Sequence, residues 1–248
     1  MSKRVLVISD LHCGAHTGLT PPAWQTTQKQ VDAYNMYYQW VTNNGPYDHV
    51  IVNGDAIDGT DSKGGGVEAI TTDRIEQCKI AEVAIREAGC KSIHIVAGTP
   101  YHVGNAEDFE SVLAVNLGAT FKGHGFYNIE GIEFNVKHKV GTSSLPHLKL
   151  TPLAKEVLQN RMWYLEGVEP KADVLIRSHT HSYSQVDTQG CIAFVTPALQ
   201  SMGNRYGARQ CTGVVNFGLL IIDVHQEGIQ WKLLQANGES QQTKSIIL

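Results

Sequence analysis

The sequence predicts a layered α/β fold, and three observations support it. Short apolar runs at 5–8, 50–52 and 174–176 lack polar alternation, which is typical of strands buried on both faces of a sheet. Segments with helical apolar spacing lie between such runs and end at glycine, proline or asparagine. No linker, repeat or low-complexity stretch marks a boundary, so the chain is predicted to form one domain, 1–248.

The first half of the chain alternates strands with helices. The double proline at 21–22 stops any strand and favours the start of a helix, whose apolar side chains keep helical spacing up to the stop at 43–46. A later helical segment ends at Gly89. In order, the predicted elements are a strand over 5–8, a helix over 23–43, a strand over 49–52, a helix over 67–89, a strand over 92–97 and a helix over 107–117.

The second half is richer in strands. Glu130-Gly131 forms a turn between two of them, and Thr151-Pro152 supplies the N-cap and first position of a helix. Later segments alternate or run apolar, as antiparallel strands do. In order, we predict strands over 126–129 and 132–137, a helix over 151–165, and strands over 172–176, 191–195, 213–223 and 229–235.

Composition describes an ordinary globular protein, with 42% hydrophobic and 18% charged residues. The formal charge is −4, from 20 basic and 24 acidic residues, so the chain has no overall basic footprint for nucleic acid. Nucleic acid stays open as a substrate, because bound divalent cations would be the largest local charges in a site.

The sequence also predicts a cytoplasmic protein that does not enter a membrane. The apolar run after Met-Ser-Lys-Arg stops at Ile8, which is too short for a signal-peptide core, and no stretch reaches the length of a membrane span. Five cysteines are scattered without a Cys-x-x-Cys motif, which indicates reduced thiols.

The end of the first strand carries a pattern suited to metal binding. Asp10 and His12 follow the apolar run directly and are followed by Gly14. Since residues i and i+2 of an extended chain point the same way, the carboxylate and the imidazole would aim at one spot. Taken alone, Asp-x-His also arises by chance or as a turn cap.

The same arrangement recurs, because five predicted strands each end in Asp or His. Any single member could be a cap, a turn residue or a core histidine, but five strand ends together point to a metal site. Ligation by Asp and His without cysteine suits Mn²⁺, Fe or Zn²⁺ rather than a structural zinc site. These strand-end residues are Asp10 with His12, Asp55, His102, His138, and His179 with His181.

In this order the motifs resemble those of the calcineurin-like metallophosphoesterase superfamily, from residue 5 to about residue 181. The segments 98–102 and 10–14 resemble the versions found in phage and prophage proteins. The motifs that carry the resemblance are Asp10-Leu11-His12, Gly54-Asp55-Ala56-Ile57-Asp58, Gly98-Thr99-Pro100-Tyr101-His102, His138, and Ser178-His179-Thr180-His181.

The resemblance implies two stacked mixed β-sheets flanked by helices, with two divalent metal ions at the strand ends. It assigns the first metal to Asp10, His12 and His181, the bridge to Asp55, and the second metal to His138 and His179. Two cations roughly 3.5–4 Å apart can clamp a phosphoryl group and activate a water for in-line attack. Mn²⁺ is the expected metal, with Fe, Zn²⁺ or Ni²⁺ as alternatives.

One motif departs from the family pattern, in which Gly-Asn-His supplies a metal-binding asparagine and an acid. Thr99 stands at the asparagine position, and His102 comes two residues late. Either Thr99 or a water fills the metal position and His102 is the general acid, which we prefer, or His102 is itself a ligand. Asp58 would hydrogen-bond and orient His102, unless it only caps a turn.

The sequence thus predicts a binuclear metal-dependent phosphodiesterase that acts on nucleic acid or a nucleotide-type substrate, in the cytoplasm or, if phage-encoded, the host cytoplasm. The alternatives are a phosphomonoesterase, acting on proteins or small metabolites, and a non-catalytic scaffold, which the Thr99 substitution favours. Arg177, Arg205 and Arg209 are candidates to bind the substrate phosphate or are ordinary surface residues.

Overall fold

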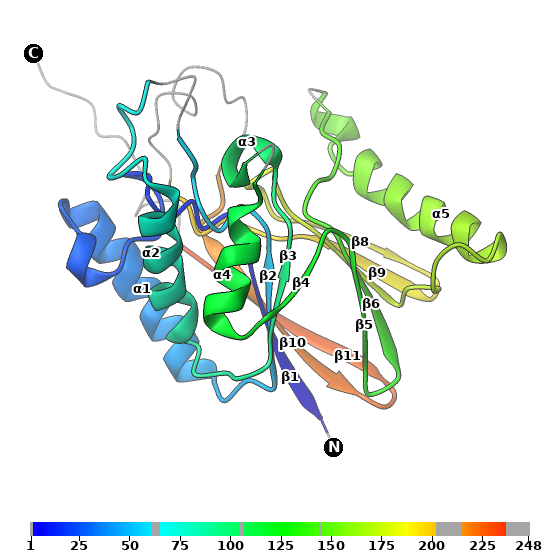
Figure 1. Cartoon of the computed structure of the whole chain (residues 1–248). Coiled ribbons are helices and arrows are strands. Elements are labelled where there is room, and N and C mark those ends of the chain that lie inside the picture. The colour runs from blue at the N-terminus through cyan, green and yellow to red at the C-terminus, as the bar shows by residue number, and fades with distance from the viewer. Residues whose placement is uncertain (1, 61–64, 105–106, 144, 202–214, 237–248) are drawn as a thin grey trace, which may run out of the picture.

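Two β-sheets lie face to face, with helices on both outer faces (Figure 1). The computed structural model describes residues 2–60, 65–104, 107–143, 145–201 and 215–236. Both sheets are mixed, so the predicted fold class of two stacked mixed sheets flanked by helices is confirmed.

The first sheet has six strands in the order β11-β10-β1-β2-β3-β4. Strands β1 to β4 run parallel, whereas β10 is antiparallel to β1 and β11 is antiparallel to β10. The carboxyl ends of β1, β2 and β3 therefore meet at one edge of the sheet. The strands are β1 (Lys3–Ile8), β2 (His49–Asn53), β3 (Ile93–Val96), β4 (Thr120–Lys122), β10 (Gly218–His225) and β11 (Gly228–Gln235).

The second sheet has five strands in the order β5-β6-β7-β9-β8. Its central strands β6, β7 and β9 are parallel, and the two outer strands are antiparallel to their neighbours. The strands are β5 (Gly125–Ile129), β6 (Ile132–Val136), β7 (Val174–Arg177), β8 (Ser184–Thr188) and β9 (Cys191–Val195).

Helices cover the outer face of each sheet. Helices α1 (Gln28–Asn44), α2 (Arg74–Arg86) and α4 (Phe109–Leu117) pack on the first sheet, and α5 (Thr151–Leu165) packs on the second (Figure 1). One-turn helices occur at Pro22–Trp24, at α3 (Pro100–Val103) and at Pro146–Leu148. None of the described helices is long and apolar enough to cross a membrane.

Successive side chains of β1 point to opposite faces of the sheet, and a hydrophobic core covers each face. Leu6 and Ile8 point into the core beneath the helices, whereas Val5 and Val7 point into the core between the two sheets. Both cores exclude water. A strand that alternated apolar and polar residues would bury polar side chains in one of them, which is why β1 is apolar over residues 5–8.

Two helices begin later than predicted, because a capping residue sets their first turn. Thr27 and Gln30 form a reciprocal capping box that starts α1 at Gln28, and Asp73 accepts the N–H groups of Ile75 and Glu76 at the start of α2. Four short elements were not predicted, which are α3, β4, β8 and the one-turn helix Pro146–Leu148.

Candidate metal centre

Six aspartates and histidines gather where strands of the two sheets end. In each of two groups of three, one ligand atom from every residue lies within 4.8 Å of the others. The first group is Asp10, His12 and His181, and the second is Asp55, His138 and His179. These six residues are the ones that the family resemblance assigns to the two metals. A third group in the described chain contains His12, Asp55 and His102.

The backbone at these positions is strained. Asp10, His12, Asp55, His179 and His181 have φ values of 49°, 45°, 50°, 74° and 54°. Apart from Glu130, these are the only non-glycine residues with positive φ in the described part of the chain. Such a conformation costs about 1–3 kcal/mol per residue and persists where the surrounding structure demands it, which is typical of functional sites.

This strain corrects one step of the sequence argument. Asp10 and His12 do converge, but not because they alternate along an extended strand. Strand β1 ends at Ile8, and both residues adopt the left-handed conformation beyond it. Their N–H groups donate to the carbonyls of Gly54 and Asp55, at 3.0 Å in each case, so the segment after β1 is held against the segment after β2.

Hydrogen bonds at Nδ1 fix the ring orientation of two of the histidines. The Nδ1 of His138 lies 2.6 Å from the carbonyl oxygen of Asn53, and the Nδ1 of His12 lies 3.0 Å from Oδ1 of Asp58. When Nδ1–H donates to these oxygens, the Nε2 lone pair of each ring is turned towards the cluster. The Nε2 atoms of His12 and His181 lie 3.2 Å apart, which is a separation that two ligands of one cation adopt.

The cluster fits divalent cations. Asp10 Oδ1 and His138 Nε2 are buried and have no hydrogen-bond partner in the described chain. Burial alone would raise the pKa of Asp10, but the neighbouring His181 and His138 hold it below its usual range. Burial would likewise lower the pKa of His138, but Asp55 and Asp10 raise it instead. The two carboxylates therefore favour positive charge between them, which bound cations would supply.

Two glycines leave the space that the cluster occupies. A Cβ on Gly54, where φ is 77°, would lie 2.5 Å from Nδ1 of His138. A Cβ on Gly98 would lie 2.3 Å from Oδ1 of Asp55. Any larger residue at either position would displace a candidate ligand.

Thr99 and His102 lie beside Asp55, as their position in the sequence predicts. The Thr99 N–H donates to Asp55 Oδ1 at 2.6 Å, and its hydroxyl lies 3.1 and 3.2 Å from the two carboxylate oxygens. The His102 ring lies edge-on to the His12 ring, with centroids 4.5 Å apart. Burial and the neighbouring His12 lower the pKa of His102. Both interpretations of His102, acid and ligand, stay open in this geometry.

The role predicted for Asp58 is corrected. Its carboxylate hydrogen-bonds His12 and lies 3.6 Å from Nδ1 of His102, which instead hydrogen-bonds the backbone carbonyl of Asp58 at 2.7 Å. The reason is the helical turn α3, which places the ring of His102 against the backbone of Asp58. Asp58 thus orients His12 with its side chain and His102 with its main chain.

Arg177, a predicted ligand of the substrate phosphate, lies away from the cluster in the structure. Its side chain is buried and donates to Glu156 Oε2 at 2.9 Å and to the carbonyls of Asn135 and Ile176. Because its guanidinium pairs with Glu156 of α5 and is buried, Arg177 points away from the cluster and cannot reach a substrate there. The other candidate phosphate ligands, Arg205 and Arg209, lie outside the described residues.

Replacement of Arg177 by methionine is therefore expected to lower the free energy of unfolding by about 2–3 kcal/mol, because it removes the charged donor of the buried Asn135 and Ile176 carbonyls while Glu156 keeps Lys137 as a partner. The substrate KM should not change. Lys137→Met is the matched control, since Lys137 pairs with the same Glu156 carboxylate from a more exposed position and should cost less than about 1 kcal/mol. Urea denaturation checks both; a raised KM with unchanged stability would restore Arg177 as a substrate ligand.

Glu110 is a residue of this centre that the sequence analysis missed. Its buried carboxylate accepts the N–H groups of Ala56 and Gly98, each at 2.7 Å, and so joins the loops that carry Asp55 and Thr99. Burial, followed by the charge of Asp55, raises the pKa of Glu110 to about 8. Its place in a helix, away from every motif, left no signal in the sequence.

The raised pKa predicts a pH dependence for the metal-free protein. A carboxyl group that holds its proton more tightly when folded stabilises the fold below its unfolded pKa near 4.5, and this contribution is lost as the pH rises towards about 8. Wild type should lose on the order of a few kcal/mol relative to Glu110→Gln over this range, because glutamine does not ionise. Urea denaturation in chelator at pH 5 and pH 8 tests this; a pH-independent difference would contradict it.

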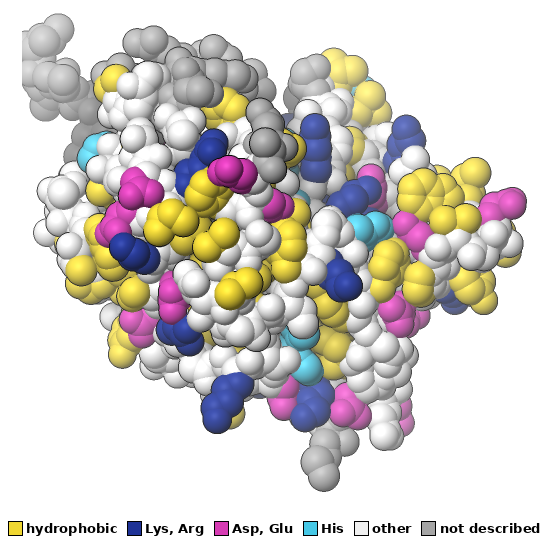
Figure 2. Space-filling view, viewed as in Figure 1, with side chains coloured by type: hydrophobic (Ala, Val, Ile, Leu, Met, Phe, Trp, Pro, Cys, Tyr) yellow, Lys and Arg dark blue, Asp and Glu magenta, His cyan; other side chains and the backbone are white. Residues whose placement is uncertain are grey.

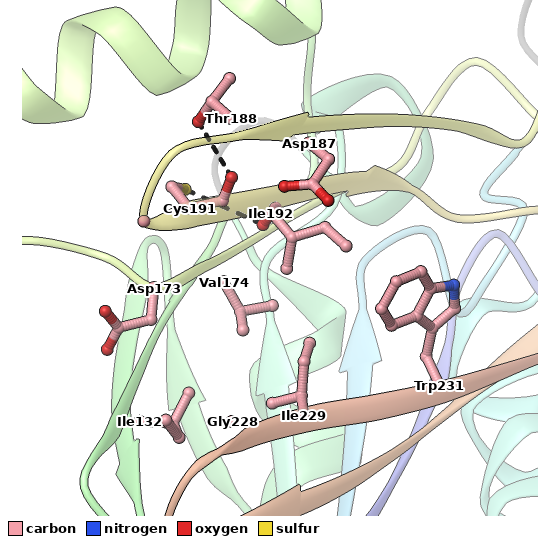
Figure 3. A pocket seen from close by; sticks show the side chains of 11 residues that line it. Ile132, Asp173, Val174, Asp187, Thr188, Cys191, Ile192, Gly228, Ile229 and Trp231 are labelled. Atoms are coloured by element: carbon pink, nitrogen blue, oxygen red, sulfur yellow. Dashed lines mark hydrogen bonds between the residues drawn. The ribbon is translucent and has the colours of Figure 1, made fainter.

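A surface cavity of about 340 Å³ lies away from the cluster (Figure 3). It opens at the amino-terminal ends of β7 and β9 and is bordered by Asp173, Asp187, Ile229 and Trp231. The candidate ligands lie beyond the carboxyl ends of β1, β2, β6 and β7, and none of them lines this cavity. The cavity and the ligand cluster are therefore separate features of the surface.

Comparison with known proteins gives structural likeness only. No family model and no curated protein matches the sequence. Among solved structures, a protein of Streptococcus pneumoniae described as a predicted phosphoesterase has 11% identity, covering 95% of this chain and 90% of that chain, with a TM-score of 0.46. Zn²⁺-complexed Vps29 of Entamoeba histolytica has 12% identity, with 94% and 98% coverage and a TM-score of 0.47.

A protein described as a novel archaeal phosphodiesterase is similar to the same degree. It has 12% identity, with 93% and 99% coverage and a TM-score of 0.47. Likenesses at this level carry no argument about the activity of this chain, which rests on the site itself. Nothing among them supports the narrower resemblance to phage and prophage proteins.

Proposed function

We propose that this chain is a metal-dependent phosphoesterase that holds two divalent cations and hydrolyses phosphodiesters, with nucleic acid or a nucleotide as the substrate class. One observation carries the proposal, namely the two groups of three Asp and His residues whose ligand atoms converge within 4.8 Å at the strand ends. The strained backbone of five of the six residues supports it, since folding alone gives no reason to retain that cost.

The residues present suit this chemistry. Asp10, His12 and His181 would hold one cation, His138 and His179 the other, and the Asp55 carboxylate would bridge them. When bound, the pair would supply positive charge to the phosphoryl oxygens and lower the pKa of a water for attack. The donor set of nitrogen and oxygen without sulfur suits Mn²⁺, which we propose as the metal, with Fe, Zn²⁺ and Ni²⁺ as alternatives.

The chain's own groups supply orientation and a proton. Asn53 and Asp58 hold the His138 and His12 rings in place through their Nδ1 atoms. His102 is held by the Asp58 carbonyl at Nδ1, which leaves Nε2 to carry a proton to the departing oxygen. The aspartates are fully buried whereas His179, His181 and His102 are partly exposed, so the substrate would approach from the histidine side.

A diester is favoured over a monoester by charge. The hydrogen bonds and ion pairs of the described cluster involve imidazoles, carboxylates, Thr99 and backbone groups, with no lysine or arginine. A phosphodiester carries one negative charge and a monoester up to two, so beyond the two cations the described cluster offers no lysine or arginine to bind the second charge of a monoester.

The test combines metal analysis with hydrolysis of bis(p-nitrophenyl) phosphate, with and without added Mn²⁺, and Fe²⁺, Zn²⁺ and Ni²⁺ in parallel. We expect two metals per chain and faster hydrolysis of the diester than of p-nitrophenyl phosphate. Faster monoester hydrolysis would establish the phosphomonoesterase instead. Absence of both metal and turnover would establish the scaffold, with Thr99 as the sign of a lost site.

A further inference from the structure

The outer face of α5 is unusually apolar. More than half of the exposed large hydrophobic side chains in the described chain lie between residues 145 and 168. Figure 2 shows hydrophobic side chains gathered over α5, at the right of the view. On a monomeric protein, contiguous apolar patches of this kind mark interaction sites.

The pattern along the helix is that of a helix–helix seam. Leu153, Val157 and Asn160 face the second sheet and are buried. On the opposite side, Leu158, Met162 and Leu165 are 61%, 63% and 81% exposed. These three residues continue a row that begins at Thr151 and Lys155, with successive spacings of four and three residues. This is the spacing by which one helix packs against another.

The ends of this seam carry opposite charges. Lys155 precedes the apolar residues and Glu166 follows them, both exposed and on the same side of the helix. If two copies of α5 pack in opposite directions, Lys155 of each copy meets Glu166 of the other. A parallel pair would instead place lysine beside lysine and glutamate beside glutamate.

We propose that a second copy of this chain covers this face, with the two α5 helices packed antiparallel about a two-fold axis near Leu158 and Met162. Trp163 is also exposed beside the seam, and Val168 is exposed just beyond the end of the helix. Leu158, Met162 and Leu165 would form the apolar centre of the interface, and Lys155 and Glu166 its charged rim. A two-fold axis makes one self-complementary patch sufficient for both copies.

Analytical ultracentrifugation of the full chain, from low to high micromolar concentration, tests the proposal. Wild type is expected to sediment as a dimer, and Leu158→Glu should weaken association by at least about 30-fold. Val115→Glu is the matched control, because Val115 is 80% exposed on α4 and should leave the dimer intact. Thermal unfolding of the dissociated variant verifies that it remains folded.

Charge reversal distinguishes antiparallel from parallel packing of the two α5 helices. Lys155→Glu and Glu166→Lys should each weaken the dimer by repulsion at both ends of the seam, and the double variant should restore it. A wild type that stays monomeric at all concentrations overturns the proposal, as does a dimer that survives Leu158→Glu. Single reversals without effect overturn the antiparallel pairing. None of these residues belongs to the metal centre, so the outcome is independent of the proposed function.

Discussion

Replacement of Asp55 by asparagine is expected to remove metal binding and turnover together. Among the aspartates that the structure describes, Asp55 alone takes part in both the second ligand group and the group with His12 and His102. Asparagine keeps the shape and can still accept the Thr99 N–H, but it removes the negative charge that two cations would share. Loss of several kcal/mol of charge stabilisation corresponds to about 10³–10⁴-fold in rate.

Metal content by elemental analysis and hydrolysis of bis(p-nitrophenyl) phosphate measure the effect. Asp32→Asn is the matched control, since Asp32 is exposed on α1 and hydrogen-bonds only Gln28 among the interactions described. The control should retain wild-type metal content and rate. An Asp55→Asn protein with two metals and the full rate would disprove the ligand assignment.

The second large effect concerns His102. Replacement by alanine should lower the rate by roughly 10²–10⁴-fold while both metals remain bound, if this histidine supplies a proton to the leaving group. The loss should depend on the leaving group. p-Nitrophenolate departs readily without a proton, so a diester with an alkoxide leaving group should suffer far more than bis(p-nitrophenyl) phosphate.

His225→Ala is the control for this experiment, because His225 lies at the end of β10 and belongs to none of the ligand groups. Loss of one metal in His102→Ala would identify His102 as a ligand and would contradict the general-acid role. An equal loss of rate for both leaving groups, with metals retained, would also contradict it.

The strand ends were predictable because two local rules act on them. Buried parallel strands need apolar residues on both faces, as in β1 and β2, so their ends are visible as the point where polar residues begin. Parallel strands also bring their carboxyl ends to one edge. Asp10 and Asp55 could therefore be placed together from the sequence.

Other features depended on contacts between distant segments. Arg177 ends strand β7, two residues before the candidate ligand His179, yet its partner Glu156 lies on α5. The carboxylate of Asp58 turns to His12 instead of His102 because α3 coils the intervening chain. Glu110 supports the centre from α4 through backbone N–H groups, which leave no trace in a side-chain pattern.

The sequence by itself determined the layered fold class and which strand ends carry the candidate ligands, because hydrophobic period and residue type are local properties of the chain. Only the tertiary structure decided which side chain each supporting group contacts, how the ligand backbone is strained, and which apolar face of α5 stays exposed. Those outcomes depend on the direction in which each side chain leaves its strand or helix and on what another layer places opposite it.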